Sequence, residues 1–297
     1  MNAGAATDCG LVRGRNEDRY WIDPERGVFL VVDGVGGHPA GDLAAEIAVN
    51  EIQESLCGAG APDSPQPAPE DRIRRAISYA NNRIFELGQE DPARRGMACV
   101  LTLAVLQEGE ITIGHVGDSR LYLVWRGAMR KLTSDHSPVG EEEEAGVLSE
   151  QEAMNDSRRN EVFRDVGSRL RSAAEEGFID IRKCRFRSDA AILLCSDGVT
   201  DQLTAAKVRE IISRYEGDAE RVARDLVAAA RTAGGKDNAT ALFAAGPEFQ
   251  ARTNATRLRQ PASSTRGRRY RVLGRLAYLA YGLLLGMLVW IVLRARG

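Results

Sequence analysis

The sequence predicts an α+β fold in which antiparallel sheets are covered by helices. Short apolar runs rich in β-branched residues are separated by longer stretches with helical periodicity, so both element types are expected. The strands come in groups and the helices in pairs, whereas a doubly wound parallel sheet would need strict alternation. With 297 residues, of which 43% are hydrophobic and 28% charged, the composition is that of an ordinary globular protein.

Six apolar runs predict the strands. VFLVV at 28–32 and CVLTLAVL at 99–106 are typical, because runs of this length with few polar residues suit strands that are buried on both faces. The full set of predicted strands is 28–32, 99–106, 111–116, 121–125, 191–195 and 239–245.

Four longer segments predict helices. In one of them Ile73, Ile77, Ile84 and Leu87 recur at helical spacing, which defines one apolar face. A Pro- and Ala-rich stretch, 58–69, follows the first helix and suggests only a connecting loop. The predicted helices are 40–56, 71–88, 204–214 and 218–232.

Charge is distributed unevenly along the chain. The residues after Glu248 include ten arginines and no acidic residue, so all 42 acidic residues but only 30 of the 40 basic ones lie in 1–248. An acidic body argues against nucleic acid as the main partner, since a phosphate backbone requires a positive face. It is compatible with binding divalent cations.

The cysteines and the N-terminus indicate a reducing compartment. The five cysteines are odd in number and form no CxxC pair, so we expect reduced and largely buried thiols. The first residues lack the apolar segment of a secretory signal peptide. We therefore expect the folded body to stay in the cytoplasm.

An uncharged apolar segment at 276–293 predicts one membrane-spanning helix. Its 18 residues would measure about 27 Å as a helix, close to the hydrocarbon thickness of a bilayer. A buried helix of the soluble core would need a polar face, which this segment lacks. More arginines precede the segment than follow it, so the positive-inside rule places the body on the cytoplasmic side.

The predicted organisation is therefore a globular domain at 1–246, a basic flexible linker at 247–275, a transmembrane helix at 276–293 and a short tail at 294–297. The linker is polar and rich in small residues, and its arginines could lie against anionic lipid. We expect a single-pass protein of the cell (inner) membrane.

Four acidic motifs place carboxylates where apolar segments meet turns. They are centred on Glu17 and Asp18, on Asp33, on Asp197 and on Asp237. Carboxylates beside a core lose hydration and repel one another unless a positive charge compensates them. A hard cation such as Mg²⁺ or Mn²⁺ would do so, and a glycine after Asp33 would let a backbone carbonyl face it. Any single Asp-Gly pair is more often a plain turn, but four such motifs together favour a metal site.

In order along the chain, the motifs VRGRNED, VVDGVGGHPAG, HVGDSRLY, LTSDHS, LLCSDGVTD and GGKDNAT resemble the protein phosphatase 2C family of metal-dependent phosphatases. The resemblance covers roughly residues 5–245. It implies a four-layer α-β-β-α sandwich of two antiparallel sheets flanked by helix pairs. It also implies a monomeric catalytic domain with a binuclear Mn²⁺ or Mg²⁺ centre at one edge.

The resemblance also implies a role for each acidic residue. Asp33 would bridge both ions, Asp197 and Asp237 would complete the first site, and Glu17 with the Gly34 carbonyl would serve the second. These roles rest on motif positions alone.

Further residues of the same motifs are expected around the two ions. Asp18 would support the ligands directly or through water, while Asp118 and Asp201 would hold a third, weaker ion found in bacterial members. Arg13 would bind the substrate phosphate.

The implied reaction is direct hydrolysis of phosphoserine and phosphothreonine in proteins by a metal-activated water, with Asp33 and Arg13 as catalytic residues. No phosphoenzyme is needed, and Cys195 lacks the arginine that a thiolate phosphatase loop would require. The sequence does not decide which group acts as the general acid, because Val35 occupies the position at which some relatives have a histidine. His38 or a metal-bound water could donate the proton instead.

The remaining motif residues are interpreted as structural. His115 lies on a predicted strand, His136 is expected to order a loop, and Arg120 is expected to form an ion pair rather than bind phosphate. An acidic insert between Ser137 and Asp165 corresponds to the flap of bacterial relatives, or is simply a solvated loop.

Three alternatives remain: a regulatory module without activity, a structural cation-binding domain, and a phosphatase for small metabolites. The complete set of acidic ligands argues against the first two. The resemblance and the predicted membrane position suggest phosphoprotein substrates of a membrane-associated serine/threonine kinase.

Overall fold

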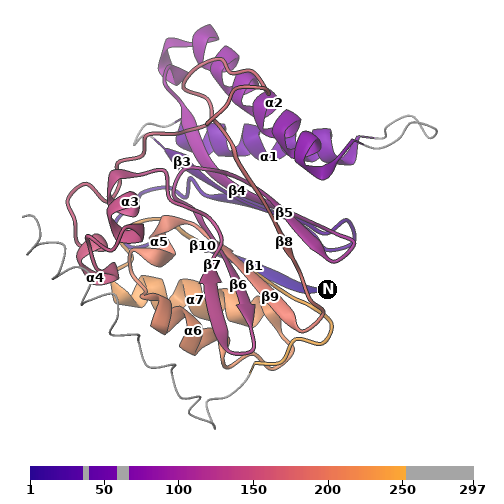
Figure 1. The fold of residues 1–297 in the computed structure, drawn as a ribbon. Coiled ribbons are helices and arrows are strands. Elements are labelled where there is room, and N and C mark those ends of the chain that lie inside the picture. Colours follow the sequence, from indigo (N-terminus) through magenta and orange to yellow (C-terminus); the bar gives the residue numbers. More distant parts are fainter. Residues whose placement is uncertain (36–39, 59–66, 252–297) are drawn as a thin grey trace, which may run out of the picture. The chain divides into compact units, whose positions relative to one another are not determined.

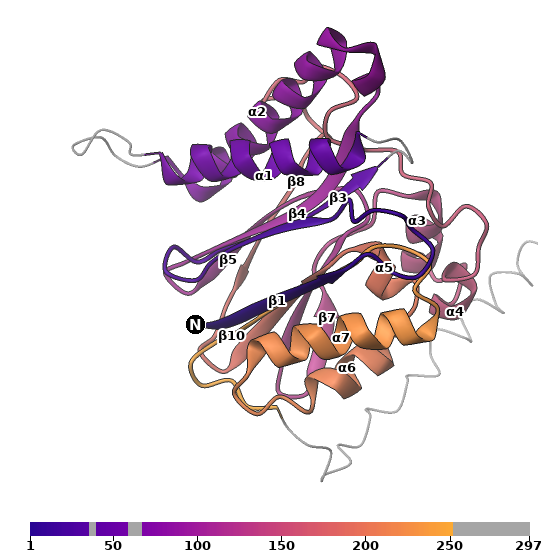
Figure 2. The ribbon, with the colours of Figure 1, turned by 180° about the vertical axis from the view of Figure 1, so that it is seen from behind.

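Two five-stranded antiparallel sheets form the centre of the molecule (Figures 1 and 2). The computed structural model describes residues 1–35, 40–58 and 67–251. The first sheet has the order β1 (Asn2–Asp8), β10 (Ala239–Ala245), β9 (Ala190–Cys195), β6 (Arg120–Trp125) and β7 (Ala128–Lys131). The second has the order β2 (Arg19–Asp23), β3 (Val28–Val35), β4 (Ala98–Gln107), β5 (Glu110–Val116) and β8 (Asp180–Arg185).

A pair of helices covers the outer face of each sheet. The second sheet carries α1 (Gly41–Cys57) and α2 (Pro69–Glu90), and the first carries α6 (Ala205–Ile212) and α7 (Ala219–Ala233) (Figure 2). The layers therefore run helix, sheet, sheet, helix. This confirms the predicted sandwich of two antiparallel sheets flanked by helix pairs.

The core consists of three apolar layers, which explains why the central strands are apolar on both faces. Along β3, Leu30 packs toward α1 and α2, while Phe29 and Val31 point into the layer between the sheets. Leu242 of β10 reaches the same middle layer, and Phe243 faces α7. Alternate side chains of one strand thus contribute to different layers.

All six predicted strands and all four predicted helices are present within one to three residues of their expected ends. The four strands that the sequence analysis missed, β1, β2, β7 and β8, are the edges of the two sheets. Short helices were missed as well: η1 (Pro92–Arg94), α3 (Pro138–Glu144), α4 (Glu150–Ala153) and α5 (Asp197–Thr200).

Beyond β10 the chain continues into the core for a few residues. Phe249 is 7% exposed and packs on Phe243 and Tyr215, with ring centroids 5.8 and 5.3 Å apart. Across 1–35, 40–58 and 67–251, no helix is both long and apolar enough to cross a membrane. The predicted span at 276–293 and most of the predicted linker lie outside these residues.

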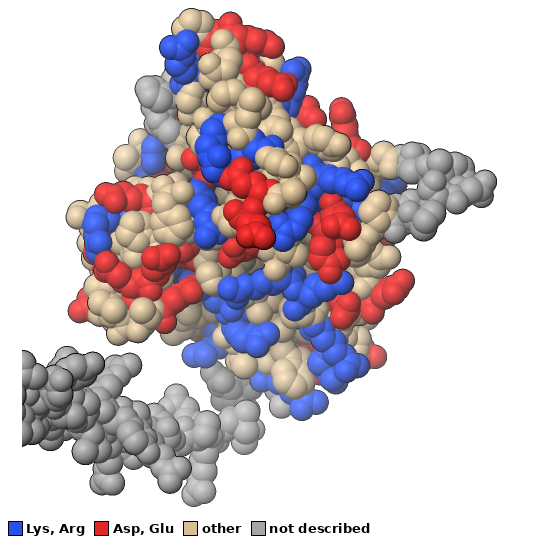
Figure 3. Space-filling view, turned by 45° about the horizontal axis from the view of Figure 1, so that its top comes forward, with Lys and Arg blue, Asp and Glu red and all other residues tan. Residues whose placement is uncertain are grey.

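The surface shown in Figure 3 carries both signs of charge. Basic side chains gather on its lower half, and acidic side chains lie beside and above them. This face therefore mixes the two charges and does not present one continuous basic surface.

Candidate metal centre

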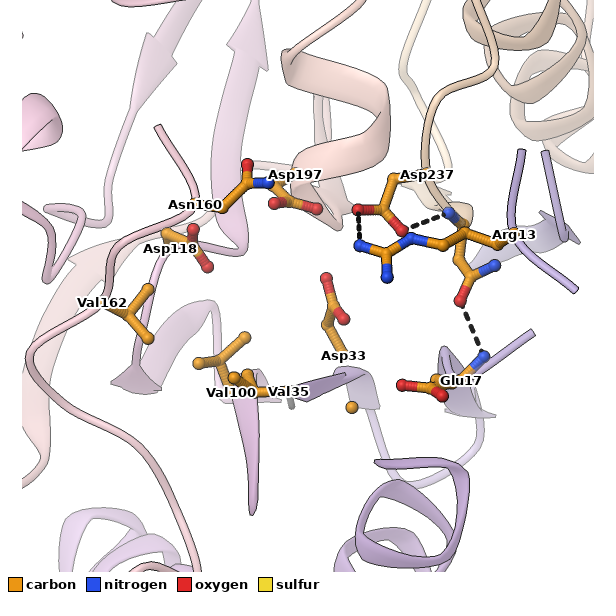
Figure 4. Close-up of a pocket in the computed structure, with 12 residues that line it drawn as sticks. Arg13, Glu17, Asp33, Val35, Val100, Asp118, Asn160, Val162, Asp197 and Asp237 are labelled. Atoms are coloured by element: carbon orange, nitrogen blue, oxygen red, sulfur yellow. Dashed lines mark hydrogen bonds and ion pairs between the residues drawn. The ribbon is translucent and has the colours of Figure 1, made fainter. Parts of the chain in front are cut away.

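The site lies at one edge of the sandwich, where strands of both sheets end. Asp33 is near the end of β3 in one sheet, Asp197 directly follows β9 of the other, and Asp237 precedes β10. Asp118 lies in the turn between β5 and β6. Because the two sheets face each other, these four residues from distant parts of the chain line one pocket (Figure 4).

The structure brings most of the predicted site residues together. The pocket is lined by Arg13, Glu17, Asp33, Gly34, Asp118, Asp197 and Asp237. Asp18 and Asp201 do not line it. Asp18 is 2% exposed and lies behind the pocket, where it accepts a hydrogen bond from Ser196 Oγ at 2.8 Å. Asp201 caps the C-terminus of α5.

Two glycines allow the backbone to approach closely at this edge. A Cβ atom at Gly34 would collide with the carbonyl oxygen of Gly41, and one at Gly41 would collide with Glu17 Oε2. Glu17, the end of β3 and the start of α1 can therefore meet only because both positions lack a side chain.

Asn238 organises the loop that carries Arg13 and Glu17. Its Oδ1 accepts from the Glu17 amide at 2.8 Å, and its Nδ2 donates to the Arg15 carbonyl at 2.8 Å and to the Cys9 carbonyl at 3.0 Å. It is 5% exposed. Asn238 belongs to the GGKDNAT motif, but the sequence alone predicts no role for it, because an asparagine after an aspartate is equally typical of a turn.

Burial and mutual repulsion destabilise the charged forms of these carboxylates. Burial, followed by the charges of Asp18, Asp197 and Asp118, raises the pKa of Asp33 well above its usual range. Burial and Asp237 raise the pKa of Asp197. Among the residues that the structure describes, no basic side chain forms an ion pair with Asp33, so a negative charge on this carboxylate would be best compensated by a cation from solution.

Asp18 shows the same effect one layer deeper. Burial raises its pKa to about 7, with a further contribution from Asp197 and Asp237 and an opposing one from hydrogen bonds. Its Oδ1 has no hydrogen-bond partner among the described residues. A buried carboxylate oxygen without a partner is costly, and water or a cation beyond it would satisfy that oxygen.

The donor set fits Mg²⁺ or Mn²⁺ in chemical type. All the converging groups are carboxylate or carbonyl oxygens, the donors that hard cations prefer. Within the described parts of the chain, no three acidic, histidine or cysteine side chains already surround one ion-sized point. Such ions often keep several waters and use only one or two carboxylates each, so the arrangement remains suitable.

Of the described residues that line the pocket, Arg13 alone is basic. Its Nη2 lies 2.7 Å from Asp237 Oδ2, and its side chain is 43% exposed. The hydrogen bond to Asp237 raises the pKa of Arg13, against the opposing effect of burial. One guanidinium edge is thus used on Asp237, and other donors remain for an anion that enters the pocket.

The outer pair, Asp118 and Asp201, is not free of cations. Arg159, for which the sequence predicts no role, places Nε 2.6 Å from Asp201 Oδ1 and Nη1 3.7 Å from Asp118 Oδ2. Arg159 is 6% exposed. No local sequence signal distinguishes it from the other arginines of the insert.

The residues interpreted as structural lie outside the pocket. Arg120 is buried and donates from Nη2 to Asp135 at 2.6 Å and to Glu143 at 2.7 Å. His115 contacts Thr102 Oγ1 at 2.9 Å, and His136 Nδ1 accepts from the Gly117 amide at 3.0 Å. Val35 lines the pocket, whereas His38 lies outside the described residues.

The acidic insert is more ordered than a plain surface loop. Ser137 caps α3 through a hydrogen bond from the Gly140 amide, and Ser149 with Glu152 forms a capping box on α4. After α4 the chain returns to the pocket, where Asn160 and Val162 contribute to its lining (Figure 4). This segment, 137–165, is called the flap below.

Comparison with known proteins decides the family. The profile of the protein phosphatase 2C family matches residues 14–229. The chain is 32% identical over 246 residues to the serine/threonine phosphatase stp of Listeria innocua, covering 82% of this chain and 95% of that protein. The chain belongs to the protein phosphatase 2C family. Membership over the whole domain, with serine/threonine phosphatases as relatives, makes it a protein serine/threonine phosphatase.

Solved structures support the same assignment. The phosphatase Stp1 from Staphylococcus aureus matches with a TM-score of 0.72 and 29% identity, covering 82% of this chain and 95% of that one. The catalytic domain of the phosphatase PstP, solved in complex with two manganese ions, matches with a TM-score of 0.70 and 25% identity, covering 82% of this chain and 96% of that one. Each of these two solved chains is covered almost completely by the match.

Proposed function

We propose that this protein phosphatase 2C member hydrolyses phosphoserine and phosphothreonine with two Mn²⁺ or Mg²⁺ ions. Asp33 would contact both ions, Asp197 and Asp237 would complete one site, and Glu17 with the Gly34 carbonyl would complete the other. The observation that carries the proposal is the convergence of these hard oxygen donors from both sheets on one pocket. The two manganese ions bound to the relative PstP support it.

The ions and the pocket residues would have different roles in the reaction. The bound ions would supply a water of lowered pKa for in-line attack on phosphorus and would neutralise phosphoryl oxygens. Arg13 would bind the phosphate through its planar pair of N–H donors, which orients the group for that attack. Asn238 would keep Arg13 and Glu17 in position, because it forms hydrogen bonds with the backbone of the loop that carries them.

In this proposal the leaving oxygen would receive its proton from water or from His38, which lies outside the described residues. Within the described residues, no histidine lines the pocket, and His115 and His136 are engaged in the structure behind it. Among the described residues, a water molecule beside the pocket lining is therefore a better donor to the serine or threonine oxygen than either of these histidines.

The decisive test uses residues 1–251, which retain Phe249 in the core. We expect Mn²⁺-dependent hydrolysis of p-nitrophenyl phosphate and of a phosphothreonine peptide. Asp33→Asn should reduce kcat/KM by about 10³-fold or more, because it weakens both ion sites. The matched control is Asp225→Asn on the exposed face of α7, which should leave activity unchanged. Metal-independent turnover would contradict the proposal.

Arg13→Ala separates phosphate binding from metal binding. We expect the Michaelis constant for the phosphopeptide to rise about tenfold while Mn²⁺ affinity measured by calorimetry stays within about twofold. An unchanged Michaelis constant would remove Arg13 from the proposed phosphate site.

We further propose that the substrates are phosphoproteins of a serine/threonine kinase at the membrane, and that the apolar segment 276–293 holds the enzyme there. Carbonate extraction of membranes should leave the full chain in the pellet and release a chain that ends at residue 251. Release of both chains would refute the anchor. Phosphoproteomics of an Asp33→Asn strain against wild type would identify the substrates and distinguish them from small metabolites.

A further inference from the structure

A group of exposed arginines lies where an edge of one sheet adjoins an edge of the other. β7 is the last strand of the first sheet, and β8 is the last strand of the second. Arg182 on β8 joins the two edges, since it donates to the Leu132 carbonyl at 3.1 Å and to Ser134 Oγ at 2.8 Å just after β7. We call the group the basic edge, and its exposed members are Arg126, Arg130, Arg182 and Arg187.

The basic edge carries more positive charge than the carboxylates beside it compensate. Asp189 accepts from Arg187 at 2.9 Å and lies 3.8 Å from Arg126, so one carboxylate serves two guanidinium groups. The hydrogen bonds of Arg182 go to uncharged oxygens. Arg185 and Glu110, which lie opposite each other on β8 and β5, add no net charge. The surface is therefore positive and attracts an anionic partner.

The described part of the chain ends beside this surface. The Glu248 amide donates to the Ser188 carbonyl at 2.9 Å, and Ser188 Oγ donates to Glu248 Oε2 at 2.7 Å. Phe249 then packs in the core against Phe243. Because Ser188 directly follows Arg187, the chain continues beyond residue 251 from a position next to the basic edge.

The sequence beyond this point indicates which anionic partner fits. Residues 252–275 contain eight arginines and no acidic residue, and the apolar segment 276–293 follows them. Twenty-four residues can span up to about 80 Å, so this connection alone does not fix which face of the domain turns toward a membrane. We propose that the basic edge fixes it by binding the anionic headgroups of a lipid bilayer. The inference rests on the membrane anchor put forward under Proposed function.

Basic residues on edge strands also have a simpler explanation, because they keep a sheet from pairing with another chain. That explanation covers Arg130 and Arg182, which lie on β7 and β8. It does not cover Arg126 and Arg187, which lie in turns and place their guanidinium carbons 4.6 and 5.3 Å from the centre of the Trp125 ring. A tryptophan bordered by cations suits the headgroup region of a bilayer, which is polar on one side and apolar on the other.

Binding of the basic edge to lipid turns the substrate pocket away from the membrane. Trp125 pairs with Ala190 at one end of β6 and β9, and Arg120 pairs with Cys195 at the other end. Asp197 of the pocket follows Cys195 by two residues. The six residues of β9 span about 20 Å, so the pocket lies about that much farther from the lipid than Trp125 does. Phosphorylation sites of substrates must extend a similar distance from the membrane surface.

Hydrogen exchange of the full chain in nanodiscs tests this surface. One set of nanodiscs contains phosphatidylcholine alone, and the other is rich in phosphatidylglycerol. We expect exchange at 126–131 and 182–189 to slow about threefold or more in the anionic nanodiscs only, and high salt should remove the difference because it screens the charges. Equal exchange in both lipids would overturn the inference. This comparison keeps the native arginines, so it is decisive even if the variants below are unstable.

Two triple variants that remove the same charge separate the basic edge from the rest of the surface. The first, which should lose the slowing, combines Arg126→Gln, Arg130→Gln and Arg187→Gln. The matched control, which should keep it, changes exposed positions on α2, α6 and α7 and combines Arg83→Gln, Arg209→Gln and Arg224→Gln. Slowing that persists in the first variant would contradict the proposal. So would slowing that appears in either lipid only when a phosphoprotein is added, since it would assign the surface to a protein partner.

Recovery of the chain with the two kinds of nanodisc distinguishes this inference from the anchor. Recovery with both kinds supports the anchor, and the exchange then decides on the basic edge. Recovery with anionic nanodiscs only, lost in the first triple variant, would contradict the anchor and support the basic edge. Recovery with neither kind would contradict both.

Discussion

Two buried groups of carboxylates lie close together in this phosphatase and behave in opposite ways. In the pocket, Asp33 and Asp18 face other carboxylates, and burial with mutual repulsion raises the pKa of both. Beneath the flap, Asp135 is also buried, but Arg120 and Lys131 contact it at 2.6 and 3.2 Å. Burial alone would raise the pKa of Asp135, yet these cations lower it to about 2.

Burial alone therefore does not decide whether the pKa of a carboxylate is raised or lowered in this protein. What decides it is whether the fold supplies the cation. The Asp135 group has its cations built in, which makes it a structural unit. The pocket group lacks them, which leaves it to ions from solution. Arg159 at Asp118 and Asp201 is intermediate, because its cation is built in but carried on the flap.

The largest effect should come from removing the built-in cation. Arg120→Met removes the main partner of the buried Asp135 and of the partly buried Glu143, and we expect a loss of about 3–5 kcal/mol of unfolding free energy. Urea unfolding of the 1–251 domain measures it. Arg130→Met on the exposed side of β7 is the control and should change stability by about 0.5 kcal/mol or less. Equal losses of unfolding free energy in both variants would contradict the conclusion that Asp135 depends on a built-in cation.

Removing a charge from the pocket carboxylates should increase the stability of the metal-free protein instead of lowering it. Asp197→Asn relieves repulsion with its neighbours, so the metal-free protein should become more stable while activity is lost. A gain of about 1 kcal/mol would raise the melting temperature by about 2–4 °C. Scanning calorimetry in a chelator measures this. A lower melting temperature of the metal-free variant would show that Asp197 is already compensated within the fold.

The smallest effect is a pH dependence that differs between the two groups. Asp18 has a folded pKa raised from 3.8 to about 7, so its contribution to metal-free stability is greatest below pH 4 and falls as pH rises toward 7. Asp135 has a folded pKa lowered from 3.8 to about 2, so its contribution is present above pH 4 and is lost as pH falls toward 2.

Mn²⁺ should therefore raise the melting temperature more at pH 8 than at pH 5, because at pH 8 the ions neutralise charges that otherwise cost stability. A thermal shift series with and without Mn²⁺ checks this. Equal shifts at both pH values would mean that the pocket carboxylates are not the groups that bind the ions.

The fold could be predicted well where strands are central and poorly at the edges. β3, β4 and β9 are buried on both faces, so their sequences are nearly continuous apolar runs. The edge strand β8, Asp180–Arg185, is polar and largely exposed, and β1 is built of small residues. These edges pair because a neighbouring strand offers hydrogen bonds, and a local sequence does not reveal a neighbour.

The metal centre divides in a similar way. Asp33, Asp197 and Asp237 could be found because acidic residues beside apolar strands are unusual. Asn238 and Arg159 could not, because their importance depends on contacts with residues more than 40 positions away in the chain.

The sequence by itself determined the central strands, the helix pairs and the acidic residues that converge on the pocket. Apolar runs are unfavourable unless they are buried, and carboxylates beside a core are unfavourable unless a cation compensates them. Only the tertiary structure decided which carboxylates have a built-in cation and which do not. That distinction depends on distances of a few ångströms between segments far apart in the chain, and Coulomb energy changes steeply over such distances.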